Sequence, residues 1–294
     1  MTTNTKHIDT VCSCNKLFNE KTLHPLISII DFSKADEDED IRLGCYSIML
    51  LHHPINGCDY GKEKYDFNEG VLVFHSPDKA VDIHCKCCRP NKGYMLVFHP
   101  DLLCGTALGE KIKQYSFFKY KEKESLHISA REKTIFQRGL EEIENELKWG
   151  VDRFTQILIC NKLELFLNYC LRFYHRQFIT RHDANDEAIH KITSAIDTYL
   201  KSEKTSDCKQ PCPCQFAQKL NMSSAYFNDL LKHETGKDFN EYISLRRIDI
   251  AKQMILEGEI NDKEIANRLG FCTAGRFRQL FIKVVGMTPE EYRG

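Results

Sequence analysis

A repeated segment in the last third of the chain constrains its fold more than any other feature. Residues 216–223 match residues 265–272 at an offset of 49, and the match continues at an offset of 50. A repeat of this size indicates one supersecondary unit used twice. The residues that recur are Phe227, Leu230, Leu231, Gly236 and Glu241-Tyr242, which return as Phe277, Leu280, Phe281, Gly286 and Glu291-Tyr292.

Each copy is predicted to form two helices joined by a tight turn. In the second copy, Asn261 can cap a short helix with Glu264 as its reciprocal capping group. Gly270 then suits the left-handed turn that ends this helix. The first copy has Asn221 at the turn, and Asn tolerates a left-handed conformation better than most residues. The pattern therefore predicts two helix-turn-helix units, joined by an amphipathic helix over residues 240–257.

The exposed faces of the two second helices carry the candidate DNA contacts. Two such helices on one rigid connector could enter successive major grooves about 34 Å apart. Arginine reads guanine or holds a phosphate, and glutamine reads adenine. Because Asp229 repels phosphate, we expect the first unit to be the weaker one electrostatically. The candidates are Ser224, Tyr226, Asn228, Asp229 and Lys232 in the first unit, and Thr273, Arg276, Arg278, Gln279 and Lys283 in the second.

Residues from about 186 to 294 resemble the DNA-binding domain of the AraC/XylS family of transcription regulators. The resemblance implies a promoter-binding regulator and not an enzyme, with double-stranded promoter DNA as its partner and RNA polymerase as a further candidate partner. The chain departs from the family at Asp229, where a basic residue is common, and at Gly275-Arg276, where Ser-Tyr is usual. The matching residues are 222–232, Glu234-Thr235-Gly236, Glu241-Tyr242, Ile265-Ala266, Leu269-Gly270-Phe271, Phe277, Phe281 and 286–293.

The net charge of the chain does not by itself indicate a nucleic-acid-binding protein. The chain has 41 Lys and Arg residues against 42 Asp and Glu residues, which gives a formal net charge of −1. Local charge must therefore carry any interaction with DNA. No apolar run is long enough to span a membrane, and residues 1–10 lack the apolar core of a secretory signal. We expect a cytoplasmic protein.

Short β-type runs separated by turn signals characterise the first half of the chain. This spacing predicts an all-β sandwich or barrel. Residues 67–77 resemble the cupin-like sensing domain that precedes many DNA-binding domains of this family, which implies a small-molecule effector bound inside a barrel. The sequence identifies neither the effector nor the residues that hold it. The predicted strands are residues 26–32, 45–51, 70–75 and 93–99.

The middle of the chain is predicted to be helical. Ser129 can cap the first helix, with Glu132 at the capping-box position. Residues 154–178 have an apolar surface wide enough for both an internal core and a partner helix. An internal core alone explains such a stripe equally well, whereas the family resemblance favours a homodimer formed through these helices.

The predicted fold class is α+β, with an N-terminal cupin-like β-barrel, following helices and a C-terminal all-α domain of two helix-turn-helix units joined by a linker helix. The predicted parts are an N-terminal arm (1–25), the barrel effector-sensing domain (26–125), a helical dimerisation region (126–180), a polar linker (181–187) and the DNA-binding domain (188–294). No cofactor is expected.

Cysteine clusters leave open a thiol- or metal-sensing regulator. The thiols and imidazole of His84, Cys85, Cys87 and Cys88 could bind a soft metal such as Zn or Cu(I). A second cluster, Cys208, Cys212 and Cys214, precedes the first helix-turn-helix unit. Against both, the fourteen cysteines are scattered along the chain, and most are expected to be reduced, buried and inert.

A cupin enzyme with a helical appendage is the other alternative. The metal set of a catalytic cupin has two histidines one residue apart, followed by a glutamate and a further histidine. Here His52 and His53 are adjacent and no fitting glutamate follows. A binding module therefore fits the first half better than a metalloenzyme does.

Overall fold

The computed structural model describes residues 6–31, 41–51, 60–77, 80–81, 93–202, 211–258 and 261–294. The chain divides into two compact units, residues 1–182 and 183–294, and each is described by itself. Within the described residues, no helix is both long and apolar enough to cross a membrane.

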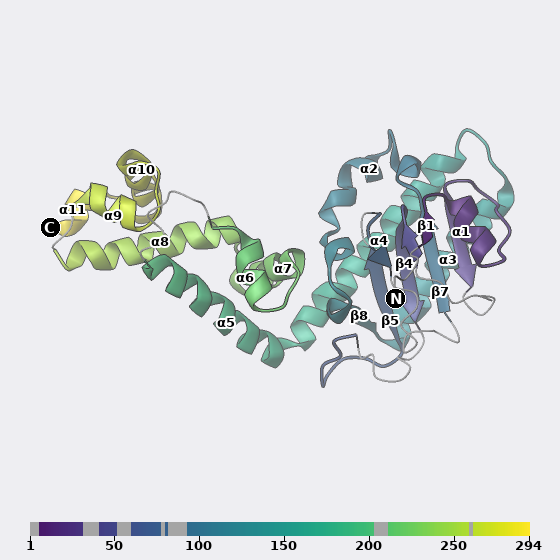
Figure 1. The fold of residues 1–294 in the computed structure, drawn as a ribbon, viewed down its shortest axis with the longest axis horizontal. Helices are drawn as coiled ribbons and strands as arrows, with labels where there is room; N and C mark the ends of the chain where they lie inside the picture. The colour runs from purple at the N-terminus through teal and green to yellow at the C-terminus, as the bar shows by residue number, and fades with distance from the viewer. Residues whose placement is uncertain are drawn as a thin grey trace. The chain divides into compact units, whose positions relative to one another are not determined.

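The first unit is built on two β-sheets and two long helices (Figure 1). The larger sheet has the order β2-β7-β4-β5-β8 with antiparallel pairs throughout, and the smaller has the order β1-β3-β6. The strands are β1 (Lys6–Ile8), β2 (Ile27–Asp31), β3 (Ile41–Leu43), β4 (Tyr46–Leu51), β5 (Gly70–His75), β6 (Ala80–Val81), β7 (Gly93–Phe98) and β8 (Leu126–Ile128). The helices are α1 (Val11–Leu17), α2 (Ala107–Lys111), α3 (Ala130–Trp149) and α4 (Thr155–Thr180).

The predicted strands are confirmed as β2, β4, β5 and β7, but the predicted barrel is not. Over the described residues, the larger sheet is open, with β2 and β8 as its edges. The reason lies in the pairing of β8, whose Ile128 and Leu126 face Gly70 and Leu72 of β5 and no residue of β2. A barrel needs its first and last strands to pair with each other.

Both faces of the larger sheet are buried. Side chains alternate along each strand, so Val73 of β5 packs on one face in the same core cluster as Val11 of α1. Phe74 points to the other face, where its ring lies 4.5 Å from that of Phe117 and 5.9 Å from that of Tyr174 on α4. The sheet is therefore the middle layer of the unit, which explains why every residue of β5 is buried.

Helices α3 and α4 approach each other closely at Gly139. A Cβ atom at Gly139 would lie 2.6 Å from Cδ2 of Phe166. We therefore expect Gly139→Ala to lower the free energy of unfolding of the first unit by about 1–3 kcal/mol through overpacking, although alanine is the better helix former. Urea unfolding of the full-length protein measures this change.

Gly275→Ala is the matched control for that substitution. Gly275 is also inside a helix, but a Cβ atom there would meet only Oγ1 of Thr273, at 3.9 Å. This variant should gain about 0.5–1 kcal/mol from helix propensity alone. If both glycine variants gained stability, the close contact at Gly139 would be contradicted.

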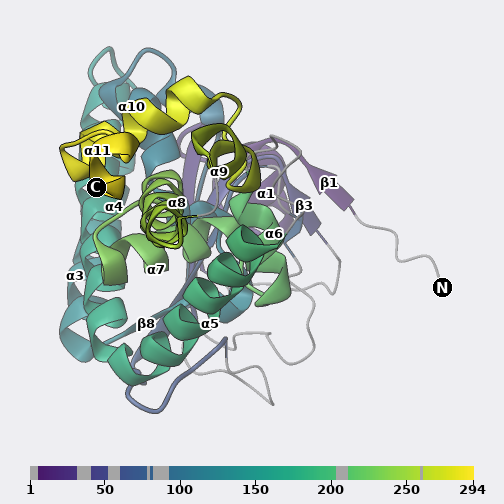
Figure 2. The same ribbon diagram turned by 90° about the vertical axis from the view of Figure 1, so that its left-hand side faces the viewer.

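The second unit is entirely helical in its described residues. Helix α8 runs along its middle, with α6 and α7 at one end and α9, α10 and α11 towards the other (Figure 1). Figure 2 looks almost straight down α8. The helices are α5 (His182–Lys201), α6 (Pro213–Lys219), α7 (Ser224–Thr235), α8 (Phe239–Leu256), α9 (Asp262–Arg268), α10 (Ala274–Val285) and α11 (Pro289–Arg293).

The boundary between the two units lies between His182 and Asp183, inside the predicted linker. Residues 182–187 are the first turns of α5, so this polar segment is helical. Helix α8 matches the amphipathic helix predicted over residues 240–257, and Gly258 follows it with a φ of 80°.

Candidate nucleic-acid interface

The two copies of the repeat fold with the same turn. Helices α6 and α7 form the first helix-turn-helix unit, and α9 and α10 form the second. Asn221 and Gly270 occupy the turn with φ values of 57° and 70°. The backbone N–H of the next residue donates to the carbonyl of Ala217 in the first unit (2.9 Å) and of Ala266 in the second (2.8 Å). Asn221 therefore replaces the turn glycine as predicted.

The second helix of each unit begins and ends in the same way. The hydroxyls of Ser223 and Thr273 accept hydrogen bonds from backbone N–H groups one turn into α7 and α10. Gly236 and Gly286 end these helices in the left-handed conformation, with φ values of 72° and 87°. These caps satisfy groups that a helix end leaves open, and they give both helices the same length.

Aromatic rings pack on the buried face of α7 and of α10. In the first unit, the ring of Phe227 lies 6.4 Å from Phe216 and 5.9 Å from Phe239. In the second, the ring of Phe277 lies 5.5 Å from Phe271 and 5.7 Å from Phe281. The apolar face of each helix is thereby fixed inward, so its opposite face is presented to solvent.

The outward face of α10 carries a stripe of three polar side chains that we call the α10 stripe: Arg276, Gln279 and Lys283. All three are exposed, and their spacing of three and four residues places them on one side of the helix, opposite Phe277 and Phe281. Among the described residues, neither Arg276 nor Lys283 has an ion-pair partner. The α10 stripe is therefore available to an external anion.

Arg278 is also on the surface of α10, but unlike the residues of the α10 stripe it is held by carboxylates of neighbouring helices. Its Nε donates to Oδ2 of Asp262 on α9 at 2.9 Å, and its Nη2 donates to Oε1 of Glu290 on α11. The hydrogen bond that Arg278 donates to Asp262 raises the pKa of Arg278 above its usual value. Asp262 is buried and also pairs with Arg293 at 3.5 Å. Arg278 thus joins three helices of the second unit, and its guanidinium is already engaged.

Not all of the five residues predicted on the exposed face of α7 are exposed. Ser224 and Lys232 are exposed, and Asn228 and Asp229 are half-buried. Tyr226, which we expected on the exposed face, is only 7% exposed. The correction follows from helix geometry, because Tyr226 lies one turn before the fully buried Leu230 and so turns towards the core.

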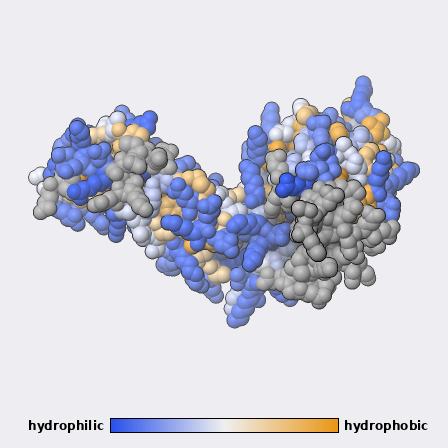
Figure 3. All heavy atoms as spheres, in the orientation of Figure 1, coloured by the Kyte–Doolittle hydropathy of each residue, from blue (hydrophilic) through white to orange (hydrophobic). Residues whose placement is uncertain are grey.

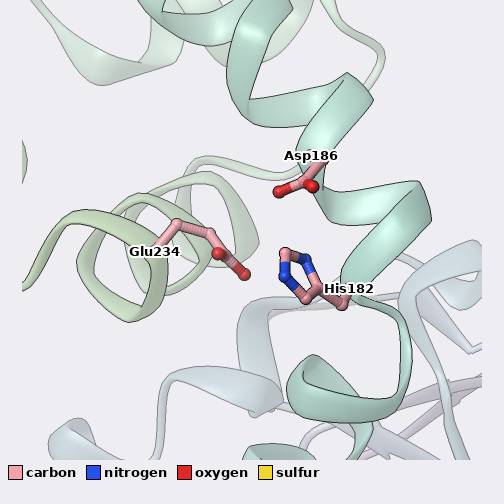
Figure 4. Close-up of side chains that lie close together, drawn as sticks. All are labelled: His182, Asp186 and Glu234. Carbon is pink, nitrogen blue, oxygen red and sulfur yellow. The ribbon is translucent and has the colours of Figure 1, made fainter.

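The two units also differ in charge. Asp229 holds the position in α7 that Gln279 holds in α10, at the repeat offset of 50. Close to the other end of α7, the carboxylates of Glu234 and Asp186 from α5 face each other within 4.8 Å (Figure 4). The third side chain drawn there, His182, begins α5 and falls in the first unit. Helices α6 and α7 together carry two Lys or Arg and two Asp or Glu residues, whereas α9 and α10 carry five and two, so the first helix-turn-helix unit is the less positive.

Two adjacent arginines on helix α8 contact α5 and the turn of the second helix-turn-helix unit. Arg246 donates from Nε and Nη2 to the carboxylate of Asp197 on α5, at 3.0 and 2.6 Å, which raises the pKa of Arg246. Arg247 is buried, which lowers the pKa of Arg247, and its guanidinium lies 5.3 Å from the centre of the Phe271 ring. Phe271 belongs to the turn of the second unit, so α8 holds that turn directly.

Sequence reasoning missed Asp262, Glu290, Arg246 and Arg247 as parts of this frame. The only signal for the first two was an acidic residue in the first turn of a short helix, which has a sufficient explanation as a favourable interaction with the helix dipole. Their pairing with Arg278 depends on how α9, α10 and α11 pack.

The cysteine predictions have mixed outcomes. His84, Cys85, Cys87 and Cys88 lie outside the described residues, as do Cys208 and the pair His52-His53. Among the described cysteines, Cys14, Cys45, Cys160 and Cys170 are buried thiols, and burial raises the pKa of Cys14 to about 12. Contrary to the expectation of reduced thiols, Cys212 and Cys214 are joined by a disulfide.

Comparison with known proteins gives a family match within residues 183–294 and similarity to several transcriptional regulators. A family profile described as a helix-turn-helix domain matches residues 216–294. The uncharacterized transcriptional regulator YtdP of Bacillus subtilis is 33% identical over 109 residues, which are 37% of this chain and 13% of YtdP. The uncharacterized regulator YijO of Escherichia coli is 27% identical over 188 residues, which are 63% of this chain and 62% of YijO. The chain therefore spans less than two thirds of either relative.

Among the solved structures that are similar to part of this chain is one domain of a response regulator. The C-terminal domain of the two-component response regulator yesN from Fusobacterium nucleatum is 30% identical, with a TM-score of 0.32. The match covers 37% of this chain and 99% of that domain.

Proposed function

We propose that the whole protein is a cytoplasmic, sequence-specific transcription regulator of promoter DNA of the AraC type, and the match of residues 216–294 to a helix-turn-helix family profile supports this. The observation that carries the proposal is the α10 stripe on the second of two matching helix-turn-helix units. This exposed helix carries an amide and two cations that pair with no carboxylate in the described part of the chain, and such groups donate to phosphates and base edges.

We assign the contacts within α10 by their position along the helix. The N-terminal residues of a recognition helix contact base edges, so Arg276 and Gln279 read sequence. Lys283 lies near the other end and holds a phosphate, while the hydroxyl of Thr273 caps the helix at the groove. Arg278 positions α10 against α9 and α11 and does not contact DNA itself. By this assignment, the second helix-turn-helix unit provides most of the specificity for DNA sequence.

For α7 the proposal keeps Ser224, Asn228, Asp229 and Lys232 as contacts and drops the buried Tyr226. Asp229 weakens this contact because its charge repels the phosphates of the duplex. The first helix-turn-helix unit then contributes the weaker of two contacts with successive major grooves.

The direct test is selection of binding sites from a pool of random duplexes by the full-length protein. A regulator of this kind enriches one motif, with the strongest preference at the positions that α10 contacts. Recovery of the protein with duplexes that share no motif would leave only non-specific binding and would contradict the proposal.

Asp229→Asn should tighten DNA binding. Removing one negative charge next to the phosphates is expected to raise affinity by up to about fivefold at low salt, with a smaller gain at physiological salt. Fluorescence anisotropy with a selected duplex measures the change. Glu187→Gln on α5 removes the same charge outside both helix-turn-helix units and should leave the affinity as it is. Equal gains in both variants would show a general charge effect and no contact at Asp229.

The N-terminal unit, residues 1–182, is proposed to sense a small-molecule effector. In support, this unit is compact by itself and has its own hydrophobic core, which packs on both faces of the larger sheet. An effector acts only through a difference in its affinity for two states of the protein. A screen for compounds that both raise the thermal midpoint and change DNA affinity tests this role, and a compound that does only the first is not a controlling ligand.

A homodimer formed through α3 and α4 is proposed from the apolar side chains at the connection between them. Trp149, Val151, Phe154, Ile157 and Leu158 are between 43% and 85% exposed. Hydrophobic side chains reach the surface at this end of the unit (Figure 3). An exposed apolar cluster of this kind is typical of a protein–protein interface, and a second copy of the chain brings the same cluster to a two-fold contact.

Phe154→Glu is expected to shift the protein towards the monomer. A carboxylate placed in the centre of an apolar contact loses its water without gaining a partner, which should weaken dimerisation by about tenfold or more. Sedimentation velocity over a concentration series measures the change. Ile179→Glu is the control, because Ile179 is 66% exposed at the far end of α4. A wild-type protein that stays monomeric at all concentrations would rule the dimer out.

A further inference from the structure

A disulfide lies directly before the first helix of the first helix-turn-helix unit. Cys212 and Cys214 are cross-linked, with their Cα atoms 5.2 Å apart, inside the usual range for disulfides. Cys212 is the N-cap of α6, and its Sγ accepts a hydrogen bond from the backbone N–H of Cys214 at 3.4 Å. Pro213 between them occupies the first helical position.

This cross-link is poorly suited to a purely structural role. A disulfide constrains the unfolded chain less as the loop that it closes becomes shorter, and this loop holds one residue between the two cysteines. Both cysteines are only half-buried, so oxidants and reductants can reach them. The buried thiols Cys14 and Cys170 contrast with this pair, since burial strongly raises the pKa of each. Accessible, exposed disulfides are the labile and regulatory ones.

The two cysteines are connected through helix α6 to α7, the helix of the first helix-turn-helix unit that is proposed to face DNA. Helix α6 begins one residue after Cys212 and carries Phe216 and Ala217, both buried. The ring of Phe216 contacts those of Tyr199 on α5 (5.6 Å) and Phe227 on α7 (6.4 Å). A change in the order of the first turn of α6 therefore reaches the helix that supports α7.

We propose that Cys212 and Cys214 form a redox-active dithiol that hydrogen peroxide oxidises and a low-molecular-weight dithiol reduces. One thiolate attacks peroxide, breaking its O–O bond to give a sulfenic acid and, after protonation, water. The second thiol then attacks the sulfenic sulfur, forming the S–S bond and releasing a second water. Two thiols lose two electrons and two protons, and one peroxide becomes two waters. Reduction by the external dithiol reverses the cross-link through a mixed disulfide.

Trypsin digestion of the full-length protein reports this chemistry without ambiguity. Cleavage after Lys209 and Lys219 releases residues 210–219, in which Cys212 and Cys214 are the only cysteines. After dithiothreitol and alkylation, the peptide should carry two alkyl groups. After hydrogen peroxide and alkylation, it should carry none and be lighter than the dithiol form by two hydrogen atoms. Two alkyl groups after peroxide, or a link from either cysteine to a different peptide, would overturn the proposal.

Hydrogen exchange and DNA affinity then test the coupling to α6. In the oxidised protein, amides of residues 211–220 should exchange more slowly than in the reduced protein, and DNA should bind about fivefold more tightly, the size of one helix cap. The variant with Cys212→Ser and Cys214→Ser should lose both responses, whereas Cys272→Ser, which removes the exposed thiol beside α10, should keep them. Identical exchange in both redox states would overturn the coupling.

Only the DNA measurement rests on the proposed function. A protein that binds no DNA in either redox state would contradict the regulator while leaving the thiol chemistry and hydrogen exchange standing. A regulator whose peptide 210–219 stays reduced would contradict the dithiol alone.

Discussion

Replacing Arg276 with alanine is expected to weaken binding to the selected duplex by roughly 5- to 150-fold, which corresponds to about 1–3 kcal/mol. The reason is that Arg276 is exposed at the start of α10, has no ion-pair partner among the described residues, and can offer both of its terminal nitrogens to one base. Fluorescence anisotropy at several salt concentrations measures the loss. Because Arg276 reads sequence, the variant should also lose preference at one position of the motif.

Lys283→Gln and Arg278→Gln are the matched comparisons within the same helix. Lys283 is assigned to a phosphate, so its replacement should weaken all duplexes alike and reduce the slope of log affinity against log salt by about 1. Arg278 is engaged by Asp262 and Glu290, so its replacement should leave this slope unchanged and lower the thermal midpoint instead. A slope reduced by Arg278→Gln would mean that Arg278 leaves its carboxylates for the duplex.

Asp66→Asn is expected to lower the free energy of unfolding of the first unit by about 3–5 kcal/mol, because it leaves a buried guanidinium without its counter-charge. Arg181 donates from Nε to Oδ1 of Asp66 at 3.0 Å and from Nη2 to Oδ2 at 2.5 Å. Its Nη2 also donates to the carbonyl of Gly61 at 3.0 Å. The exposed fractions of the two side chains are only 5% and 0%. Urea unfolding followed by far-UV circular dichroism measures the loss.

Two further variants separate the buried pair from surface charge. Glu144→Gln removes an exposed carboxylate that pairs with Lys148 one turn away on α3, and it should cause no measurable loss. Replacing both Asp66 and Arg181 with leucine and methionine should recover much of the stability that Asp66→Asn loses, since no buried charge then remains. If the double variant were no more stable than Asp66→Asn, the unpaired charge would not be the cause.

The position of this ion pair gives it a second consequence. Arg181 follows the last residue of α4 and its backbone N–H donates to the carbonyl of Gln177. The boundary of the first unit falls immediately after it, at His182. Asp66 therefore fixes the last turn of α4, which is the point where the chain leaves the first unit.

The sequence by itself determined the second unit almost completely. The offsets of 49 and 50, the turn residues Asn221 and Gly270 and the cap Asn261 are all local signals, and each is found in the structure where the sequence placed it, although the side chain of Glu264 does not return the predicted capping bond. Local signals suffice here because a helix is stabilised by residues three and four apart and ends at its own caps. The strands of the first unit followed from alternation and turn residues in the same way.

Only the tertiary structure decided how these elements close and which charges remain free. The pairing of β8 with β5, which leaves the larger sheet open, joins segments more than fifty residues apart. Asp66 and Arg181 are 115 residues apart, and no local pattern connects them. Arg278 and Arg276 look equivalent in the sequence, yet the packing of α9 and α11 places carboxylates beside Arg278 and leaves Arg276 in solvent. Contacts of this kind depend on three-dimensional packing, which residue spacing within one helix does not encode.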